Sequence, residues 1–314
     1  IYGYDPERKE HLRELVLDED LPDLETTPEE AASFLRMHGP QHCAVYRAEN
    51  GACRVRFKRG LRLFVSRAVQ ADRLVMGQVP TGWDARRYGL PDDLCRQVDP
   101  VTAFSLVSTQ EAFLQAGITD PYELYEHVHV AEVGNCSGGG EGGLRSNQVI
   151  FKSRFFDQPV QSDILQESFI NTMPAWANLL LLSAAGPIRA PVGACATAVQ
   201  SIEAGLECIL AGKAKVVVVG GYDDASEESS CEFAAMRATS DSRDELARGR
   251  DPREHCRPAA SSRGGFMESQ GAGTQILMTA GLAIQMGCPI YGIVAGTATA
   301  SDRQGRSIPA PGQG

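Results

Sequence analysis

Apolar and polar positions in the second half of the chain switch between helical and strand-like patterns. One helical face is formed by Val199, Ile202, Leu206, Ile209 and Leu210. Gly212 ends that helix, and the run "KVVVVGG" (215–221) that follows is apolar at successive positions, as in a parallel strand buried on both faces. Segments 271–279, 280–287 and 289–300 then repeat strand, helix and strand. This alternation predicts an α/β layer fold.

Two helices are predicted earlier in the chain. Residues 99–118 carry closely spaced apolar positions, which predicts a mostly buried helix that ends at Gly117. A second helical segment is predicted in 162–186, where Asp163 and Gln166 have the spacing of a capping box. Pro174 lies inside this segment, so we expect the helix to be kinked or divided there.

Residues 1–75 differ from the remainder and are predicted to form an α+β N-terminal appendage. We expect a helix over 5–16 and another from Pro28, with Thr27 as its cap. The alternating stretch 53–65 predicts strands. From Met76 onward the chain is richer in glycine and alanine, and it ends on a loop-like stretch, which suggests a piece of a longer protein.

Composition and charge exclude several classes of function. The chain has 314 residues, 43% of them apolar, and carries 30 basic and 40 acidic residues for a net charge of -10. No basic stripe is dense enough to neutralise a nucleic-acid backbone, so we expect no nucleic-acid partner. No apolar run reaches the length of a membrane span, and the first residues are charged, unlike a signal peptide. The sequence therefore predicts a cytoplasmic protein without a membrane partner.

Cysteine and histidine are not arranged as metal sites. The chain has 9 cysteines with no C-x-x-C pair, and we expect them to be reduced thiols. His127 and His129 are the closest pair of histidines, and their spacing indicates alternate residues of a strand. The acidic residues Asp223, Asp224, Glu227 and Glu228 follow the predicted buried strand without basic or histidine ligands, and we interpret them as solvated charges. No metal site is predicted.

Cys195 lies in "GACAT", after a predicted strand and at the start of a predicted helix. Gly193, Ala194 and Ala196 leave little bulk around the sulfur, so a sharp turn there exposes the thiol. The start of a helix provides partial positive charge and unpaired N–H groups, which favour a thiolate and hold a developing oxyanion. These are the requirements of acyl transfer to sulfur. Position alone leaves open the alternative of a buried core cysteine.

Seven segments resemble one family in the same order along the chain. They are "PTGWDARRYGLPDDLCRQVDPVT", "EVGNCSGGGEGG", "QPVQSDILQESFINTMPAW", "PVGACATAV", "GGYDDASEE", "RPAASSRGGFMESQGAG" and "GRSIPAPGQG". "PVGACATAV" is similar to the nucleophile turn of β-ketoacyl synthases. The longer segments resemble the ketoacyl synthase region of the fungal type I fatty acid synthase α subunit, from the N-terminal appendage to the last residue.

The resemblance implies a thiolase-like layered α/β fold, of which residues 76–314 form the N-terminal half. It implies that Cys195 accepts an acyl chain as a thioester, which malonyl carried on an acyl carrier protein then extends by two carbons after decarboxylation. No cofactor of its own is implied, because the substrates are carried on phosphopantetheine. The implied partners are the acyl carrier protein, a second copy in a homodimer, and a fatty acid synthase β subunit.

The family's two catalytic histidines and its lysine belong to the second half, and none of their motifs occurs in this chain. We therefore expect the chain alone to be inactive in condensation and to expose the face that the other half covers. Two rival functions remain: a thiolase-fold relative that acts on coenzyme A esters, and a structural piece with an idle thiol. Arg86, in "RRYG", is a weak candidate for contact with the carrier protein.

The glycine-rich loop supports two interpretations. Gly138, Gly140 and Gly143 match G-x-G-x-x-G, but Glu141 would place a negative charge inside a pyrophosphate site, which disfavours nucleotide binding. In the resembling synthases the loop borders the acyl pocket, with methionine at the position of Glu141. The resemblance thus implies an acyl pocket lined by Gly140, Glu141, Gly142 and Phe266. A carboxylate there suggests a short-chain synthase, unless Glu141 turns outward.

Overall fold

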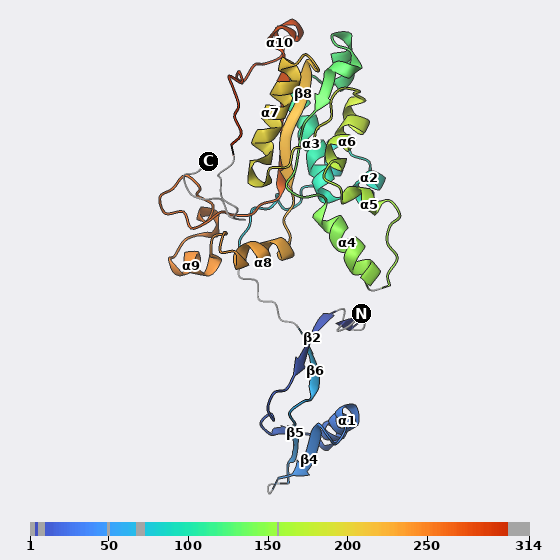
Figure 1. Cartoon of the computed structure of the whole chain (residues 1–314), viewed down its shortest axis with the longest axis vertical. Coiled ribbons are helices and arrows are strands. Elements are labelled where there is room, and N and C mark those ends of the chain that lie inside the picture. Colours follow the sequence, from blue (N-terminus) through green and yellow to red (C-terminus); the bar gives the residue numbers. More distant parts are fainter. Residues whose placement is uncertain (1–3, 6–9, 49–50, 67–72, 156, 301–314) are drawn as a thin grey trace. The chain divides into compact units, whose positions relative to one another are not determined.

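The computed structural model describes residues 4–5, 10–48, 51–66, 73–155 and 157–300. The chain divides into two compact units, residues 1–70 and 71–314, each of which is described by itself (Figure 1). This division follows Gln70, a few residues before the boundary drawn from composition. The interpretation of the two parts as an appendage and a half-synthase stays a prediction.

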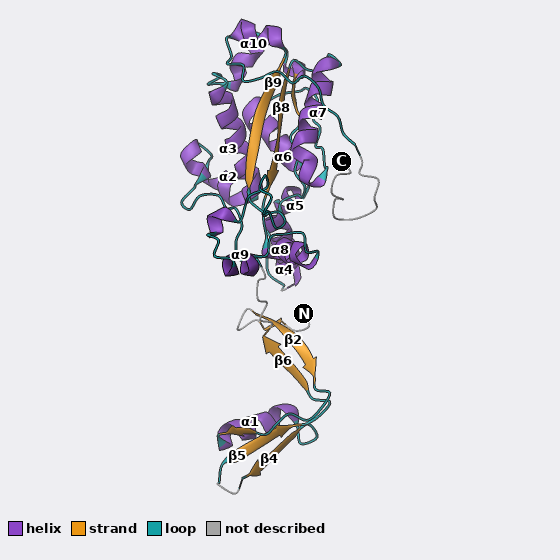
Figure 2. Cartoon of the chain, turned by 90° about the vertical axis from the view of Figure 1, so that its left-hand side faces the viewer, coloured by secondary structure: helices purple, strands orange, loops and turns teal. Residues whose placement is uncertain are grey.

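The smaller unit holds two antiparallel sheets of three strands. Their orders are β1-β2-β6 and β3-β5-β4. The strands are β1 (Tyr4–Asp5), β2 (Glu10–Val16), β3 (Leu24–Thr26), β4 (Cys43–Arg47), β5 (Cys53–Phe57) and β6 (Arg62–Ser66). Helix α1 (Pro28–His38) packs on the second sheet, with Phe34 edge-on to Phe57 at 5.4 Å between ring centroids (Figure 2).

Local signals at α1 act as the sequence predicts. Thr27 caps the helix: its hydroxyl accepts from the Glu30 N–H at 3.3 Å, and the Thr27 N–H donates to the Glu30 carboxylate at 3.3 Å. The reciprocal pair satisfies backbone donors that the helix itself cannot. Pro28 occupies the first helical position, where its missing N–H costs nothing.

The predicted helix over 5–16 is wrong, because residues 10–16 form β2. Its apolar positions at 12, 15 and 16 fit a helical face as well as a strand. Antiparallel pairing with β6, in the register Leu15 with Leu63 and Val16 with Arg62, provides ladder hydrogen bonds that override the helical pattern.

The larger unit is built on the sheet β7-β8-β9 (Figure 1). Strand β8 (Val216–Asp223) pairs parallel with β7 (Val133–Asn135) and antiparallel with β9 (Gly271–Met278). Val216 to Val219 of β8 are fully buried, as predicted for a strand covered on both faces.

Two helices cover the faces of this sheet. Figure 2 shows the strands between α3 (Pro100–Gln115) and α7 (Thr197–Leu210). Val216 and Val218 share a core cluster with Phe113 of α3, whereas Val217 and Val219 share one with Cys208 of α7. Successive side chains of a strand point to opposite faces, so β8 supplies both cores.

Shorter helices complete the larger unit. They are α2 (Asp92–Gln97), α4 (Leu144–Phe155), α5 (Ile164–Glu167), α6 (Thr172–Ala177), α8 (Glu227–Ala235), α9 (Ser242–Ala247) and α10 (Ala280–Met286). The segment 162–186 is divided into α5, α6 and a π-helical turn (Asn178–Leu182), but not at Pro174 as predicted: the break precedes α6, and Pro174 lies in its first turn, where a proline is tolerated. The predicted capping box is absent: among the described residues, the Asp163 side chain makes no cap hydrogen bond to α5.

Two predicted strands of the larger unit are also wrong. Val130–Glu132 form a 3₁₀ helix, because His129 caps it: the ring Nδ1 accepts from the Ala131 N–H at 3.2 Å. Residues 289–300 form no strand in the described structure, and Tyr291 and Ile293 are 83% and 88% exposed. No described strand pairs with them, and an apolar pattern without a ladder partner does not make a strand.

The fully buried stripe of α7 consists of small residues, whereas Ile202 and Ile209 of the predicted apolar face pack, partly buried, against the same core cluster as Cys208. Val199 and Leu210 are 65% and 77% exposed, while Ser201, Gly205 and Cys208 are buried. A Cβ on Gly205 would stand 2.5 Å from Cγ1 of Val219. Helix α7 therefore lies closer to β8 than a row of large side chains permits.

Candidate active site

Cys195 is exposed and lies directly before α7. It occupies a short 3₁₀ helix, Ala194–Ala196, from which the chain continues into the 14 residues of α7. The segment before it is not the predicted strand: residues 187–193 make only an isolated bridge between Ile188 and Asn135 among the described residues. The expected exposure of the thiol at the start of a helix is nevertheless present.

The turn that carries Cys195 is strained and braced. Ala194 has φ of 49°, a left-handed conformation that costs a residue with a side chain about 1–3 kcal/mol. The Thr197 hydroxyl braces the turn, since it accepts from the Gly193 N–H at 2.9 Å and donates to the Ala194 carbonyl at 2.8 Å. Strain that the surroundings maintain is characteristic of functional sites.

The glycine-rich loop 138–143 packs against this turn. A Cβ on Gly138 would stand 2.3 Å from the Pro191 carbonyl oxygen and 2.9 Å from Cγ2 of Thr197. On its other side the loop follows β8: the Gly138 N–H donates to Gly220 at 3.2 Å, and the Tyr222 N–H donates to Gly138 at 3.2 Å. The loop thus joins the thiol-bearing turn to the end of β8.

Buried carboxylates hold the far end of the loop. Gly143 lies against Asp99, which accepts from the Ser146 N–H and hydroxyl at 2.9 Å each. Glu167 accepts from the Asp99 N–H at 2.9 Å and from the Trp176 indole N–H at 2.6 Å. Their oxygens are saturated by donors, so these two carboxylates have a structural part.

Glu141 is exposed at the crest of the loop, where Gly138, Gly139 and Gly143 are buried. Partial loss of hydration, and then the negative charges of Asp223 and Glu268, raise the pKa of the Glu141 carboxyl. The structure thus places Glu141 facing outward, within reach of two other acids. The pocket role of Gly140, Glu141 and Gly142 stays a prediction.

Phe266 is 41% exposed and packs edge-on against Phe233, with ring centroids 5.2 Å apart. No described contact joins its ring to Cys195 or to the glycine-rich loop. Nearby, the Arg257 guanidinium donates to the buried Glu245 carboxylate at 2.9 Å. This pair gives Arg257 a structural part, while the pocket role of Phe266 stays a prediction.

The acidic residues after β8 are not simply solvated charges. Asp224, whose side chain is fully buried, pairs with Arg145 at 3.0 Å, and Glu228 pairs with Lys152 at 3.1 Å. Both basic residues lie on α4, directly after the glycine-rich loop. Sequence spacing concealed these partners because about 80 residues separate them.

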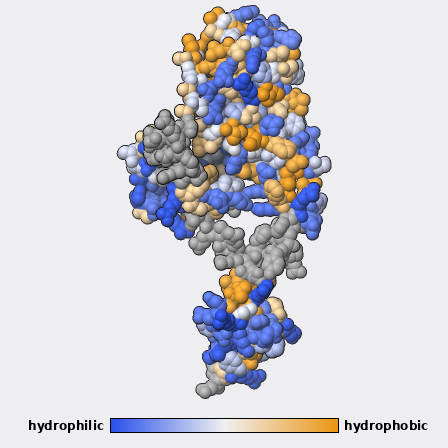
Figure 3. Space-filling view, in the orientation of Figure 1, coloured by the Kyte–Doolittle hydropathy of each residue, from blue (hydrophilic) through white to orange (hydrophobic). Residues whose placement is uncertain are grey.

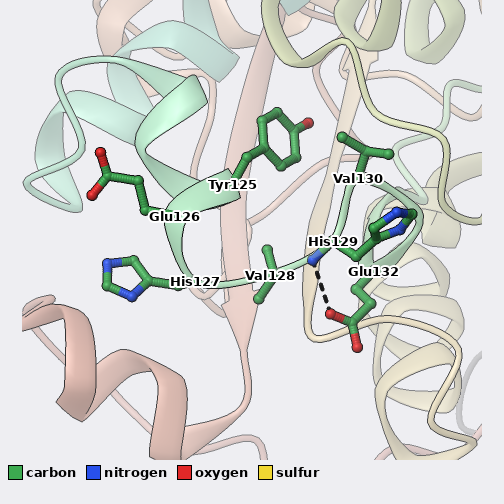
Figure 4. Close-up of a pocket in the computed structure, with 7 residues that line it drawn as sticks. All are labelled: Tyr125, Glu126, His127, Val128, His129, Val130 and Glu132. Atoms are coloured by element: carbon green, nitrogen blue, oxygen red, sulfur yellow. Dashed lines mark hydrogen bonds between the residues drawn. The ribbon is translucent and has the colours of Figure 1, made fainter.

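A shallow, open depression lies at the other end of the sheet from Cys195. It is lined by Tyr125 to Val130 and Glu132, before β7 begins (Figure 4). Figure 4 shows the rings of His127 and His129 pointing in different directions. Within the described residues no group of three or more histidine, cysteine or acidic side chains is arranged to hold a metal ion.

The geometry supports nucleophilic chemistry at sulfur. Cys195 is accessible, and no described residue accepts a hydrogen bond from its N–H. An unpaired N–H beside a nucleophile at a helix start is suited to a developing oxyanion. Among the described helices, none has the length and apolar character to cross a bilayer.

Solved structures confirm the predicted thiolase-like α/β fold. The noncanonical ketosynthase FabY from P. aeruginosa superposes with a TM-score of 0.65 and 25% identity, over 89% of this chain and 44% of that one. A beta-ketoacyl synthase from Burkholderia phymatum superposes with a TM-score of 0.60 and 19% identity, over 88% of this chain and 62% of that one.

Curated relatives and a family model agree with this fold. The chain is 56% identical to the fatty acid synthase subunit alpha of Candida albicans over 313 residues, and 56% identical to that of Schizosaccharomyces pombe over 314. These matches cover 99% and 100% of this chain but 17% of each relative. The model of the beta-ketoacyl synthase N-terminal domain matches residues 57–283, more than half of the chain. The chain therefore belongs to the beta-ketoacyl synthase family, through its N-terminal domain.

Proposed function

We propose that this chain supplies the acyl-accepting part of a β-ketoacyl-[acyl carrier protein] synthase in a fatty acid synthase α subunit. The observation that carries the proposal is the exposed Cys195 on a strained, braced turn at the start of α7. The Cys195 thiol gives up its proton, its sulfur attacks the acyl thioester carbonyl, and the carrier thiol leaves with a proton. Cys195 then holds the acyl group as a new thioester.

The second step consumes that thioester. Malonyl on the carrier loses carbon dioxide, and the carbanion attacks the Cys195 thioester carbonyl, which releases the Cys195 thiolate and a product two carbons longer. The family's histidines and lysine serve this step, and the resemblance assigns them to the other half of the synthase. We therefore expect this chain alone to accept an acyl group without condensing it.

The proposed partners follow from the relatives and from the surface. The matched relatives are fatty acid synthase α subunits, which supports an acyl carrier protein and a β subunit as partners. Figure 3 shows apolar patches on the larger unit in the view of Figure 1. Val199 and Leu210 on α7 are among the exposed apolar residues, which supports a homodimer contact through this half.

Mass spectrometry tests the proposed acyl acceptor. The complete polypeptide that contains this chain is incubated with acyl groups on the carrier protein or on coenzyme A, then weighed intact and peptide-mapped. We expect one acyl adduct, on Cys195, which Cys195→Ala removes. Cys231→Ala is the matched control, because Cys231 is also an exposed free cysteine. An adduct elsewhere contradicts the proposal, and acylation from coenzyme A without the carrier favours the thiolase-like rival.

A further inference from the structure

We propose that Asp223 is a positioning residue that holds the crest of the glycine-rich loop, Gly140 and Glu141, to the end of β8, and so shapes the space beside the Cys195 turn for the acyl chain. The inference rests on the proposed function. It starts from the end of β8, where the chain that follows the sheet meets the crest of the loop at Gly140 and Glu141.

Asp223 makes the last of a series of contacts between the glycine-rich loop and β8. Gly138 bridges to Gly221, and Gly139 lies against Tyr222, whose ring would be 2.6 Å from a Cβ at that position. Next, the Gly140 N–H donates to Oδ1 of Asp223 at 3.0 Å, and the Glu141 backbone favours the charged form of the same carboxylate. The first contacts are buried backbone packing, whereas this last one depends on a single side chain.

The residue after Asp223 holds the other side of the same segment. Asp224 accepts from Arg145 at 3.0 Å, from Gln270 at 2.9 Å and from the Ala225 N–H at 2.8 Å. Consecutive carboxylates therefore hold the chain at 140–141 and at 145. Between these points Glu141 is exposed. The crest is thus a short span with fixed ends.

The hydrogen bonding at Asp223 is weaker than the buried contacts made by Gly138, Gly139 and Asp224. Asp223 is exposed, and the Glu141 carboxylate brings negative charge towards it. Water competes for an exposed hydrogen bond, and like charges oppose the approach of Glu141. The loop can therefore open at 140–141 while Gly138 and Gly143 stay packed.

Opening matters for catalysis because the loop and the thiol-bearing turn touch. Gly138 contacts Pro191 and Thr197, and Thr197 braces the turn that presents Cys195. An acyl chain on Cys195 therefore meets the loop as a wall. We infer that the hydrogen bonding at Asp223 sets how far residues 140–141 can move away from the acyl chain, and hence how selective the protein is for acyl-chain length.

Acylation of Cys195 is measured with thioesters of graded length, in the complete polypeptide and in Asp223→Ala. We expect the ratio of rates between the best and the worst length to fall by roughly tenfold. Asp223→Asn keeps an acceptor oxygen and should retain at least part of the discrimination. A uniform loss of rate with an unchanged ratio indicates a merely structural residue and overturns the inference.

Hydrogen exchange provides a second test, which does not depend on thioester chemistry. In Asp223→Ala the peptide that contains Gly140 and Glu141 should exchange at least about tenfold faster, with little change at Gly138. Glu141→Gln removes the opposing charge and should slow exchange there. Unchanged exchange in Asp223→Ala refutes the hold whether or not Cys195 proves to be the acyl acceptor. A missing Cys195 adduct with altered exchange refutes the proposed function alone.

Discussion

Replacing Gly138 with alanine should separate the glycine-rich loop from the Cys195 turn. The added Cβ would stand 2.3 Å from the Pro191 carbonyl oxygen, whereas ordinary contacts begin near 3.4 Å. The difference means that loop and turn must move apart by about 1 Å. The obstacle is backbone on one side and the bracing Thr197 on the other, so neither yields by rotating a flexible side chain.

Two magnitudes follow from this displacement. Overpacking a tight interior costs about 1–3 kcal/mol of unfolding free energy. A misplacement of about 1 Å near a reacting group lowers a rate by about a hundredfold. Gly138→Ala should therefore fold with reduced stability while Cys195 acylation falls far more than the folded fraction does.

The assay compares acylation by intact mass with unfolding in denaturant. Gly281→Ala is the control, because it adds the same methyl group to α10 with no described atom within 4 Å of it. Its acylation rate should match that of the unchanged protein. If Gly138→Ala is acylated at the unchanged rate, the contact between loop and turn does not position the nucleophile, and the reasoning fails.

Three further predictions concern charge, buried polar groups and thiols. The pKa of Glu141 is raised in the folded state, so its carboxylate destabilises the fold at high pH, and this penalty disappears as the group is protonated at lower pH. Glu141→Gln should therefore raise the unfolding free energy at pH 8, and the gain should be lost towards pH 4.5. Denaturant titration at each pH measures both values. Glu167→Gln places an amide NH₂ where a carboxylate oxygen accepts hydrogen bonds, and should lower the unfolding free energy by about 1–3 kcal/mol in the same titration at neutral pH. An unchanged midpoint would contradict the hydrogen-bond network described for Glu167 and Trp176. Burial raises the pKa of the Cys136 thiol to about 12, so a brief alkylation at neutral pH should label Cys195 and leave Cys136 intact on peptide mapping, and labelling of Cys136 before Cys195 would show that the core is open.

Local signals in the sequence predicted much of the larger unit correctly. The run 216–219 is a buried strand, and Gly117 and Gly212 adopt the left-handed conformations that end their helices. These features depend on residues adjacent in sequence, so the pattern alone carries them. The same holds for Thr27 as the cap of α1 and for Pro28 at its first position.

The sequence-based predictions are wrong where residues distant in sequence determine the local structure. Residues 10–16 form a strand because β6 lies beside them, and the buried stripe of α7 is small because β8 comes close. At the candidate site the sequence located Cys195 and the glycine-rich loop but attributed Asp223 to solvent. Its role depends on backbone N–H groups of the loop, which no sequence pattern shows. Asp99 was detectable in part, since Asp before Pro100 is a helix-cap signal.

The narrow spacing between α7 and β8 has a consequence for how this protein can diverge. Ser201, Gly205 and Cys208 seat the helix on the sheet, and the Ser201 hydroxyl accepts from the Gly220 N–H at 2.8 Å. The core of the larger unit thereby fixes the position of Cys195, whereas the crest of the glycine-rich loop is held, in our proposal, by the exposed carboxylate of Asp223. On this proposal, mutation of Asp223 can vary the choice of acyl chain without disturbing the reactive sulfur. Reactivity and selectivity are thus free to evolve at different rates in one small domain.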